Sequence, residues 1–281
     1  MPMYRLAAFA DGAVGGNPAG VHLSPVLPDA ATMQRVAAEV GYSETVFAAP
    51  LDGGRWRVRY FAPASEVPFC GHATIALGAV LARDHGEGRF DLVLNDAAIS
   101  VEGRRDGDGF AATLTSPPTR SAPLSADAEH AALALFGWRR DVLDPRLPPA
   151  RIHAGADHYV FALRTRGLLA QMRYDLRDGQ RLMRDSGLIT IAFVYAGADR
   201  RFDARNAFAS GGVLEDPATG AAAAAFAGYL RDRRWPHGGG IEIVQGEDMG
   251  MRSRLQVAID ETPGSPVRVS GRVRDLDPHG D

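Results

Sequence analysis

The sequence contains an internal similarity at one fixed offset, and this feature restricts the possible folds more than any other. Residues 34–47 (QRVAAEVGYSETVF) match residues 180–193 (QRLMRDSGLITIAF). The matched pairs are Gln34 with Gln180, Arg35 with Arg181, Gly41 with Gly187 and Phe47 with Phe193, each 146 residues apart. Because a duplicated unit defines architecture better than local propensity does, the chain is predicted to form two similar halves.

Each half contains a helix that is apolar all round, which predicts burial at the centre of that half. The helices begin near Gly71 and near Asp216, and the same offset places Cys70 on Asp216. Asp216 precedes Pro217 and is expected to cap its helix. If a pseudo-two-fold relates the halves, both helix N-termini are expected to face one cleft and to bind an anion there.

The remaining elements are read from capping residues and strand-like runs. One helix is expected from about Asp29 to Gly41 and another from about Ser125. Strands are expected at 4–9, 55–61, 90–95, 254–260 and 266–273. The Pro-rich residues 115–123 suggest a domain crossing. The expected N-terminal lobe is 1–117, completed by a C-terminal strand at about 266–281, and the expected C-terminal lobe is 118–265.

Composition excludes several function classes. The chain has no lysine, so Schiff-base chemistry, a pyridoxal phosphate linkage and a GxxxxGK[ST] phosphate loop are ruled out. The net charge of −3 does not favour binding to nucleic acid or to an anionic membrane. No apolar run approaches the roughly 18 residues needed to span a membrane. A single cysteine cannot form an internal disulfide. We therefore expect a cytoplasmic protein with a small-molecule partner.

Cys70 and His72 are two positions apart, which on one helix would point their side chains about 200° away from each other. This spacing argues against a cysteine–histidine nucleophilic pair. A zinc site is not expected either, because the cysteine has no companions and no HExxH motif is present. Cys70 is interpreted as a small buried residue at a helix start.

Glu44 lies in GYSETVF, and its duplicate position holds Thr190. A carboxylate present in one half and replaced in the other is what an asymmetric reaction in a symmetric cleft would need. His72, Asp216 and Glu215 are weaker candidates, since histidine or acidic residues at helix ends usually serve as caps or solvated charges.

Four motifs resemble those of the PhzF-like isomerases of phenazine biosynthesis. They are GNPAGV (16–21), GYSETVF (41–47), FAPASEVPFCGHAT (61–74) and GGVLEDPATGAAAA (211–224), in the family's order and spacing. The resemblance implies the diaminopimelate epimerase fold. This is an α+β fold of two pseudo-symmetric lobes, each a mostly antiparallel, barrel-like sheet around a central helix, with the active site between them.

The resemblance also implies an activity: an isomerase that moves a proton within a small, anionic, carboxylated and unsaturated substrate, without a metal or organic cofactor. Its catalytic residues would be Glu44, as acid and base, with His72 and Asp216 in support. Asn17 and Gly71 would line the substrate site, together with Ser43, Ala73, Thr219 and Gly220. Family members often form dimers, so a homodimer is the expected assembly.

Two departures from related proteins leave alternatives open. Related epimerases and proline racemases use two facing cysteines, whereas this chain has only Cys70. Many family members have serine where this chain has Ala221, so the dihydrohydroxyanthranilate substrate does not follow from the resemblance. The alternatives are a racemase or epimerase that uses Cys70 and a carboxylate, and a non-catalytic binder of small molecules.

Overall fold

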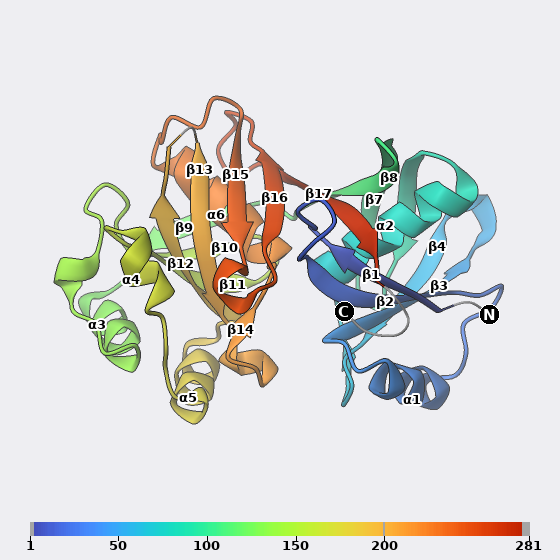
Figure 1. Cartoon of the computed structure of the whole chain (residues 1–281), viewed down its shortest axis with the longest axis horizontal. Coiled ribbons are helices and arrows are strands. Elements are labelled where there is room, and N and C mark those ends of the chain that lie inside the picture. Colours follow the sequence, from blue (N-terminus) through green and yellow to red (C-terminus); the bar gives the residue numbers. More distant parts are fainter. Residues whose placement is uncertain (1–2, 199, 277–281) are drawn as a thin grey trace. The chain divides into compact units, whose positions relative to one another are not determined.

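The computed structural model describes residues 3–198 and 200–276 and divides the chain into two compact units (Figure 1). Unit 1 is Met1–Thr115 with Ser270–Asp281, and unit 2 is Ser116–Val269. Both units combine helices with a mixed sheet, so the expected α+β class is confirmed. None of the helices in the described ranges has the length and apolar character needed to cross a bilayer.

Eight strands of unit 1 pair in a closed ring, in the order β1–β2–β3–β4–β6–β7–β8–β17 and back to β1. Their bounds are β1 (Met3–Ala8), β2 (Asn17–Leu23), β3 (Glu44–Pro50), β4 (Trp56–Phe61), β6 (Gly88–Val93), β7 (Ala98–Asp106), β8 (Gly109–Thr115) and β17 (Arg268–Asp275). β2 is parallel to β3 and β4 to β6, whereas β1 is antiparallel to β2 and β17, β3 to β4, and β7 to β6 and β8. The short strand β5 (Glu66–Val67) pairs with β4. The ring is therefore closed by a strand from the far end of the chain.

Helix α2 (Gly71–His85) packs against the strands of this ring, and its residues from His72 to Ala82 are buried. Its small residues permit a close approach, since a Cβ added to Gly78 would lie 2.6 Å from Val101 Cγ2. Helix α1 (Ala30–Val40) packs against Phe47 and Phe61 in a separate small core. Asp29 caps α1 by accepting from Thr32 N–H, and Gly41 ends it with φ 74°, as the sequence predicts.

The strands of unit 2 repeat the order of unit 1. They are β9 (Arg120–Pro123), β10 (Ala150–His153), β11 (Asp157–Ala162), β12 (Thr190–Ala196), β13 (Arg201–Ala207), β14 (Glu215–Asp216), β15 (Gly240–Gln245) and β16 (Ser253–Ala258). β11 is parallel to β12, β12 is antiparallel to β13, and β13 is parallel to β15, as in the series β2, β3, β4 and β6. The predicted duplication is confirmed by this shared strand order.

Helices fill corresponding places in the two units. Helix α6 (Gly220–Asp232) is buried from Ala222 to Arg231 and corresponds to α2. Helix α5 (Leu176–Ser186) lies between β11 and β12, as α1 lies between β2 and β3. Helices α3 (Ala126–Leu135) and α4 (Arg166–Ala170) have no counterpart and join α5 in an outer core around Phe136, Phe161 and Phe193. Both predicted central helices are thus confirmed.

One ion pair occurs twice. Arg59 on β4 binds Glu66 on β5 at 2.5 Å, and Arg205 on β13 binds Glu215 on β14 at 2.5 Å. The arginines differ by 146 positions but the glutamates by 149, because residues 62–65 form the first connection and residues 208–214 the second. The connection in unit 2 is three residues longer, and the offset found in the sequence changes there.

This change of offset corrects two sequence-based predictions. Cys70 precedes α2 as Thr219 precedes α6, so the structural counterpart of Cys70 is Thr219 and not Asp216. Asp216 does not cap α6 either, because it is extended in β14 opposite Asn206. A residue before proline avoids the helical conformation, which accounts for the later helix start.

Candidate active site

The candidate site residues of unit 1 lie where α1, β3 and α2 meet. Gly41 ends α1, Ser43 follows in the turn, and Glu44 is the first residue of β3. His72 is in the first turn of α2, and its Nε2 lies 3.4 Å from Glu44 Oε2. The Ser43 hydroxyl is 3.3 Å from the same nitrogen. The side chains of His72 and Glu44 are only 7% and 14% exposed, so the pair is held in a largely dehydrated place.

Cys70 contacts the other side of the imidazole. Its Sγ lies 3.3 Å from His72 Nδ1. The predicted separation of about 200° is wrong because Cys70 is outside the helix, with φ −142° and ψ 119°. Extended backbone at the N-cap turns the thiol back toward the first turn. With the proton on Nε2, the ring donates toward Glu44 and accepts from the thiol.

Buried hydroxyl groups fix the backbone of Cys70. Thr74 donates through Oγ1 to the Cys70 carbonyl at 2.6 Å, and Tyr60 and Thr74 share a hydrogen bond of 2.7 Å. Burial raises the pKa of Tyr60, which keeps its hydroxyl protonated. The start of α2 is thus held by a neutral hydrogen-bond chain, independently of Glu44.

The first turn of α2 offers backbone donors. The first bond of the helix runs from Thr74 N–H to the Cys70 carbonyl at 3.0 Å, so the amides of Gly71, His72 and Ala73 have no acceptor within the helix. Ala73 is fully buried, so only its backbone amide, and not its methyl group, could contribute a polar contact. Asn17 is the first residue of β2 and is buried. These groups together favour an anion near the helix start.

The candidate site residues of unit 2 lie at the start of α6. Thr219 donates through Oγ1 to Asp216 Oδ2 at 2.5 Å. Gln245, the last residue of β15, donates to the Asp216 carbonyl at 2.7 Å and to Thr219 Oγ1 at 3.1 Å. The first helix bond runs from Ala223 to Thr219, which leaves the amides of Gly220, Ala221 and Ala222 for another acceptor.

Gln245 is a site residue that the sequence analysis missed. It is 2% exposed and holds both Asp216 and Thr219 in place. The sequence did contain a signal for it. Gln245 is a polar residue at the end of the run GIEIVQ, whose pattern is that of a strand, and a polar residue at a strand end is a candidate for a functional site. The structure brings Glu44, His72 and Ser43 together in unit 1, and Asp216, Thr219 and Gly220 in unit 2. The shared cleft stays a prediction.

One cluster of potential metal ligands stands out among residues 3–198 and 200–276. The ligand atoms of Glu44, Cys70 and His72 all lie within 4.8 Å of one another. Zinc was not expected from the sequence, because the cysteine has no companions and no HExxH motif is present. The fold adds a carboxylate and an imidazole to the single thiol.

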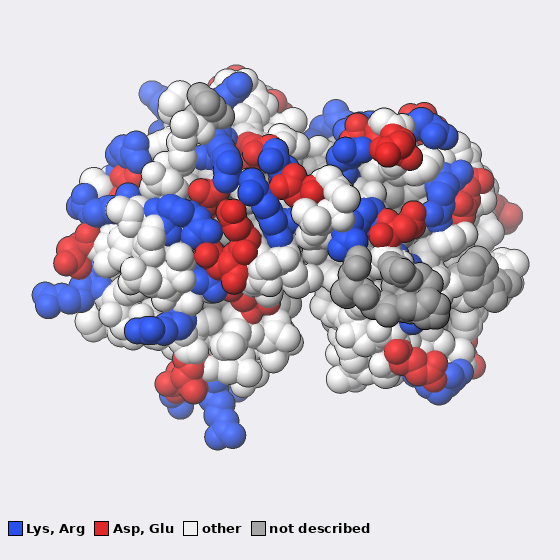
Figure 2. Space-filling view, in the orientation of Figure 1, with Lys and Arg blue, Asp and Glu red and all other residues white. Residues whose placement is uncertain are grey.

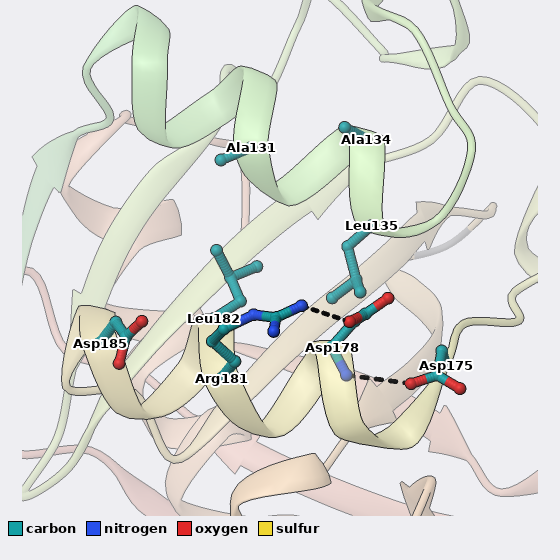
Figure 3. Close-up of a pocket in the computed structure, with 8 residues that line it drawn as sticks. All are labelled: Ala131, Ala134, Leu135, Asp175, Asp178, Arg181, Leu182 and Asp185. Carbon is teal, nitrogen blue, oxygen red and sulfur yellow. Dashed lines mark hydrogen bonds and ion pairs between the residues drawn. The ribbon is translucent and has the colours of Figure 1, made fainter.

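Charged groups at two other places in unit 2 pair with one another. A hollow of about 390 Å³ lies between α3 and α5 (Figure 3). Charged groups that line it bind one another or the backbone, since Asp178 binds Arg181 at 2.5 Å and Asp175 accepts from Asp178 N–H. Figure 2 shows arginine and acidic side chains interleaved on the face that carries β13, β15 and β16. Pairs such as Arg201 with Asp203, at 2.8 Å, neutralise one another there.

Comparison with known proteins agrees with the duplicated fold and its motifs. The family described as phenazine biosynthesis-like protein matches residues 6–274. The chain belongs to this family. An uncharacterised isomerase of Deinococcus radiodurans is 33% identical over 273 residues, covering 92% of this chain and 88% of that protein. The trans-2,3-dihydro-3-hydroxyanthranilate isomerase of Pseudomonas aeruginosa is 30% identical over 268 residues, covering 94% and 91%.

Solved structures give the same result for the fold. A predicted epimerase from Pseudomonas aeruginosa superimposes with a TM-score of 0.83 at 27% identity, covering 98% of this chain and 96% of that one. A probable proline racemase from Agrobacterium radiobacter gives 0.66 at 11% identity, covering 98% and 90%, and shows likeness of fold alone. The predicted family, fold and enzyme class, isomerase, are therefore confirmed.

Proposed function

We propose that this protein isomerises a small, carboxylated and unsaturated substrate by moving a proton, with Glu44 as both base and acid. The observation that carries the proposal is the placement of the Glu44 carboxylate, 86% buried, 3.4 Å from His72 Nε2 at the start of a buried helix. A carboxylate with one well-placed neighbour and little water can accept and return a proton.

The proposed reaction needs no group beyond the substrate and the protein. The Glu44 carboxylate removes a proton from a carbon next to the double bond, and the electron pair delocalises into the conjugated system. Protonated Glu44 then returns that proton to another carbon of the same system, so the double bond shifts and the atoms balance. His72 orients Glu44, and the amides at the start of α2 stabilise the negative charge that develops.

We assign Asp216 and the first turn of α6 to the same reaction, as groups that hold a polar part of the substrate. Gln245 fixes Asp216 through its carbonyl, and this leaves the carboxylate bonded to Thr219. Relatives named trans-2,3-dihydro-3-hydroxyanthranilate isomerases suggest a cyclic carboxylate as substrate. Ala221 lacks a hydroxyl, so anchoring is weaker by one hydrogen bond, about 0.5–1.5 kcal/mol.

The test is Glu44→Gln, assayed with trans-2,3-dihydro-3-hydroxyanthranilate and a panel of cyclic and amino-acid-like carboxylates in D₂O. The parent should form a rearranged product that carries deuterium, measured by NMR and mass spectrometry. Glutamine keeps the size of the side chain but cannot carry a proton, so we expect the rate to fall by about 10²–10⁴-fold while ligand binding persists.

Glu39→Gln is the matched control, because Glu39 lies on the exposed face of α1 and pairs with Arg35. This variant should retain the parental rate. A Glu44→Gln protein that exchanges at the parental rate, while His72→Ala or Asp216→Asn does not, would show that another residue is the base.

One observation favours a second candidate. The contact between Cys70 and His72 could serve a racemase or epimerase that uses Cys70 and a carboxylate. The structural counterpart of Cys70 is Thr219, which has no thiol, so a two-thiol racemase has no support in either unit.

A further inference from the structure

Three donor atoms of different chemistry converge at the start of α2. His72 Nε2 lies 3.4 Å from Glu44 Oε2 and 3.8 Å from Cys70 Sγ. All three ligand atoms are within 4.8 Å of one another, and all three residues are largely buried. The cluster combines a thiol, an imidazole and a carboxylate.

The two separations from His72 Nε2 can be compared with those around a tetrahedral zinc ion. Zinc binds sulfur at about 2.3 Å, nitrogen at about 2.0–2.1 Å and oxygen at about 2.0–2.2 Å, which places neighbouring ligands about 3.3–3.6 Å apart. The two distances from His72 Nε2 lie close to this range. Because Sγ also lies 3.3 Å from His72 Nδ1, an ion is accommodated when the imidazole or the thiol rotates so that Sγ and Nε2 point to it together. The hydrogen bond between Nε2 and Ser43 is then replaced.

The charges also suit a divalent cation. A Cys70 thiolate and a Glu44 carboxylate supply two negative charges, and His72 binds as a neutral ligand. The positive end of the α2 dipole opposes a cation, but it also favours the negative thiolate that coordination needs. A thiolate and an imidazole select zinc over magnesium and calcium, which prefer oxygen ligands.

We propose that Glu44, Cys70 and His72 form an inhibitory Zn²⁺ site. Zinc would bond to Cys70 Sγ, His72 Nε2 and Glu44 Oε2, release the thiol proton to solvent and leave a fourth position for water. Coordination uses the lone pair with which Glu44 would accept a proton, so turnover stops while the ion is bound. The inhibition rests on the proposed function, whereas metal binding does not.

The test titrates the chelator-treated protein with Co²⁺ as a spectroscopic substitute for Zn²⁺, and then displaces the cobalt with Zn²⁺. We expect one equivalent of Co²⁺ to produce thiolate-to-cobalt charge-transfer absorption that Zn²⁺ abolishes. Cys70→Ser should lose this absorption, and Glu44→Gln should bind Co²⁺ more than about 10-fold more weakly. His130→Ala, which removes an exposed histidine of α3, is the matched control and should titrate like the parent.

Two results would overturn the site: no charge-transfer absorption at saturating Co²⁺, or Cys70→Ser binding zinc as tightly as the parent. Isomerisation is then measured with and without Zn²⁺ for each variant against its own metal-free rate. The parent should be inhibited in proportion to occupancy, and Cys70→Ser should resist inhibition. A parent that shows the cobalt signature yet isomerises fully with zinc bound would keep the metal site and refute Glu44 as the proton carrier.

Discussion

At the scale of single residues, Cys70 shows how one backbone conformation changes the chemistry that a sequence suggests. Its place before α2, and not within it, brings the thiol to His72. Helical spacing alone predicted the opposite. Burial of Cys70 was predictable from its residue type, but its contact was not, because the exact first residue of a helix is poorly determined by sequence.

Cys70→Ala tests whether the thiol takes part in proton transfer. We expect turnover within a few-fold of the parent, measured with a chelator present, and a loss of about 1 kcal/mol in the free energy of unfolding from the lost packing. A well-folded variant that loses several orders of magnitude in rate would instead support the racemase or epimerase that uses Cys70.

Ala221→Ser tests the missing hydroxyl at the start of α6. Serine would add one donor beside the amides of the first turn. We expect tighter binding of a carboxylated ligand by about 2- to 10-fold, measured by calorimetry, because a hydrogen bond contributes about 0.5–1.5 kcal/mol. Ala221→Val adds volume without a donor and should give no gain; equal gains from both variants would contradict this explanation.

His158 makes stability depend on pH. It is fully buried on β11, shares a 2.7 Å hydrogen bond with Thr190, and its Nε2 is among the buried polar atoms of the described residues that lack a partner. Burial lowers the pKa of His158 from 6.5 to about 3. The unfolded chain therefore binds a proton below pH 6.5 while the folded chain does not, and stability is lost as the pH falls from 6.5 toward 3.

The expected loss from this group is about 1.4 kcal/mol per pH unit, or about 2 kcal/mol at pH 5 relative to neutral pH. Denaturant unfolding at several pH values between 7.5 and 5 measures it. His158→Asn should have a shallower slope than the parent, and identical slopes would show that another group is responsible.

At the scale of elements, the repeated arginine–glutamate pair joins the strand before each central helix to the turn that leads into it. Arg59 donates to Glu66, whereas Arg205 donates to Glu215 and also to the carbonyls of Leu169, Ala170 and Met172. The same ion pair is therefore expected to contribute more to the stability of unit 2 than to that of unit 1. The pair in unit 2 is also more deeply buried, with side chains 11% and 6% exposed.

Arg205→Met and Arg59→Met are predicted to differ in cost. Removing Arg205 leaves Glu215 buried without its cation, and we expect a loss of about 3–5 kcal/mol in unfolding free energy. Removing Arg59 leaves the carboxylate of Glu66, which is already partly solvated, and we expect a loss of about 1 kcal/mol in unfolding free energy. Chemical denaturation of both variants measures the difference, and equal losses would contradict the role assigned to burial.

Sequence patterns predicted the elements better than their junctions. Residue type and hydrophobic periodicity predicted the two apolar helices and the left-handed end of α1 at Gly41. Matching residues predicted the offset of 146. The three extra residues in 208–214 shift the register before α6, and only tertiary pairing of Asn206 with Asp216 reveals it. Gln245 was missed for the same reason, since its partners lie 26 and 29 positions away.

At the scale of the whole molecule, unit 1 needs both ends of the chain. Leu6, Ala7 and Ala8 on β1 pair with Asp275, Arg274 and Val273 on β17. Without β17, the edges of β1 and β8 would be unpaired, and open strand edges favour aggregation.

A chain that ends at Val269 is therefore expected to lose the closed ring. Hydrogen exchange should show lost protection within residues 3–115, while residues 116–269 keep theirs. A chain that ends at Leu276 retains β17 and is the control. Full protection of residues 3–115 in the shorter chain would show that the ring does not depend on its last strand.

The pairing of β1 with β17 also sets an order of events during synthesis on the ribosome. Unit 1 emerges first, but its last strand follows roughly 150 residues later, after all of unit 2. At about 5–20 residues per second, the ring without its eighth strand waits for about 8–30 s with two edges open. The apolar helix α2 is already translated during that interval, so nascent chains of this protein should depend on chaperones that shield such surfaces until translation ends.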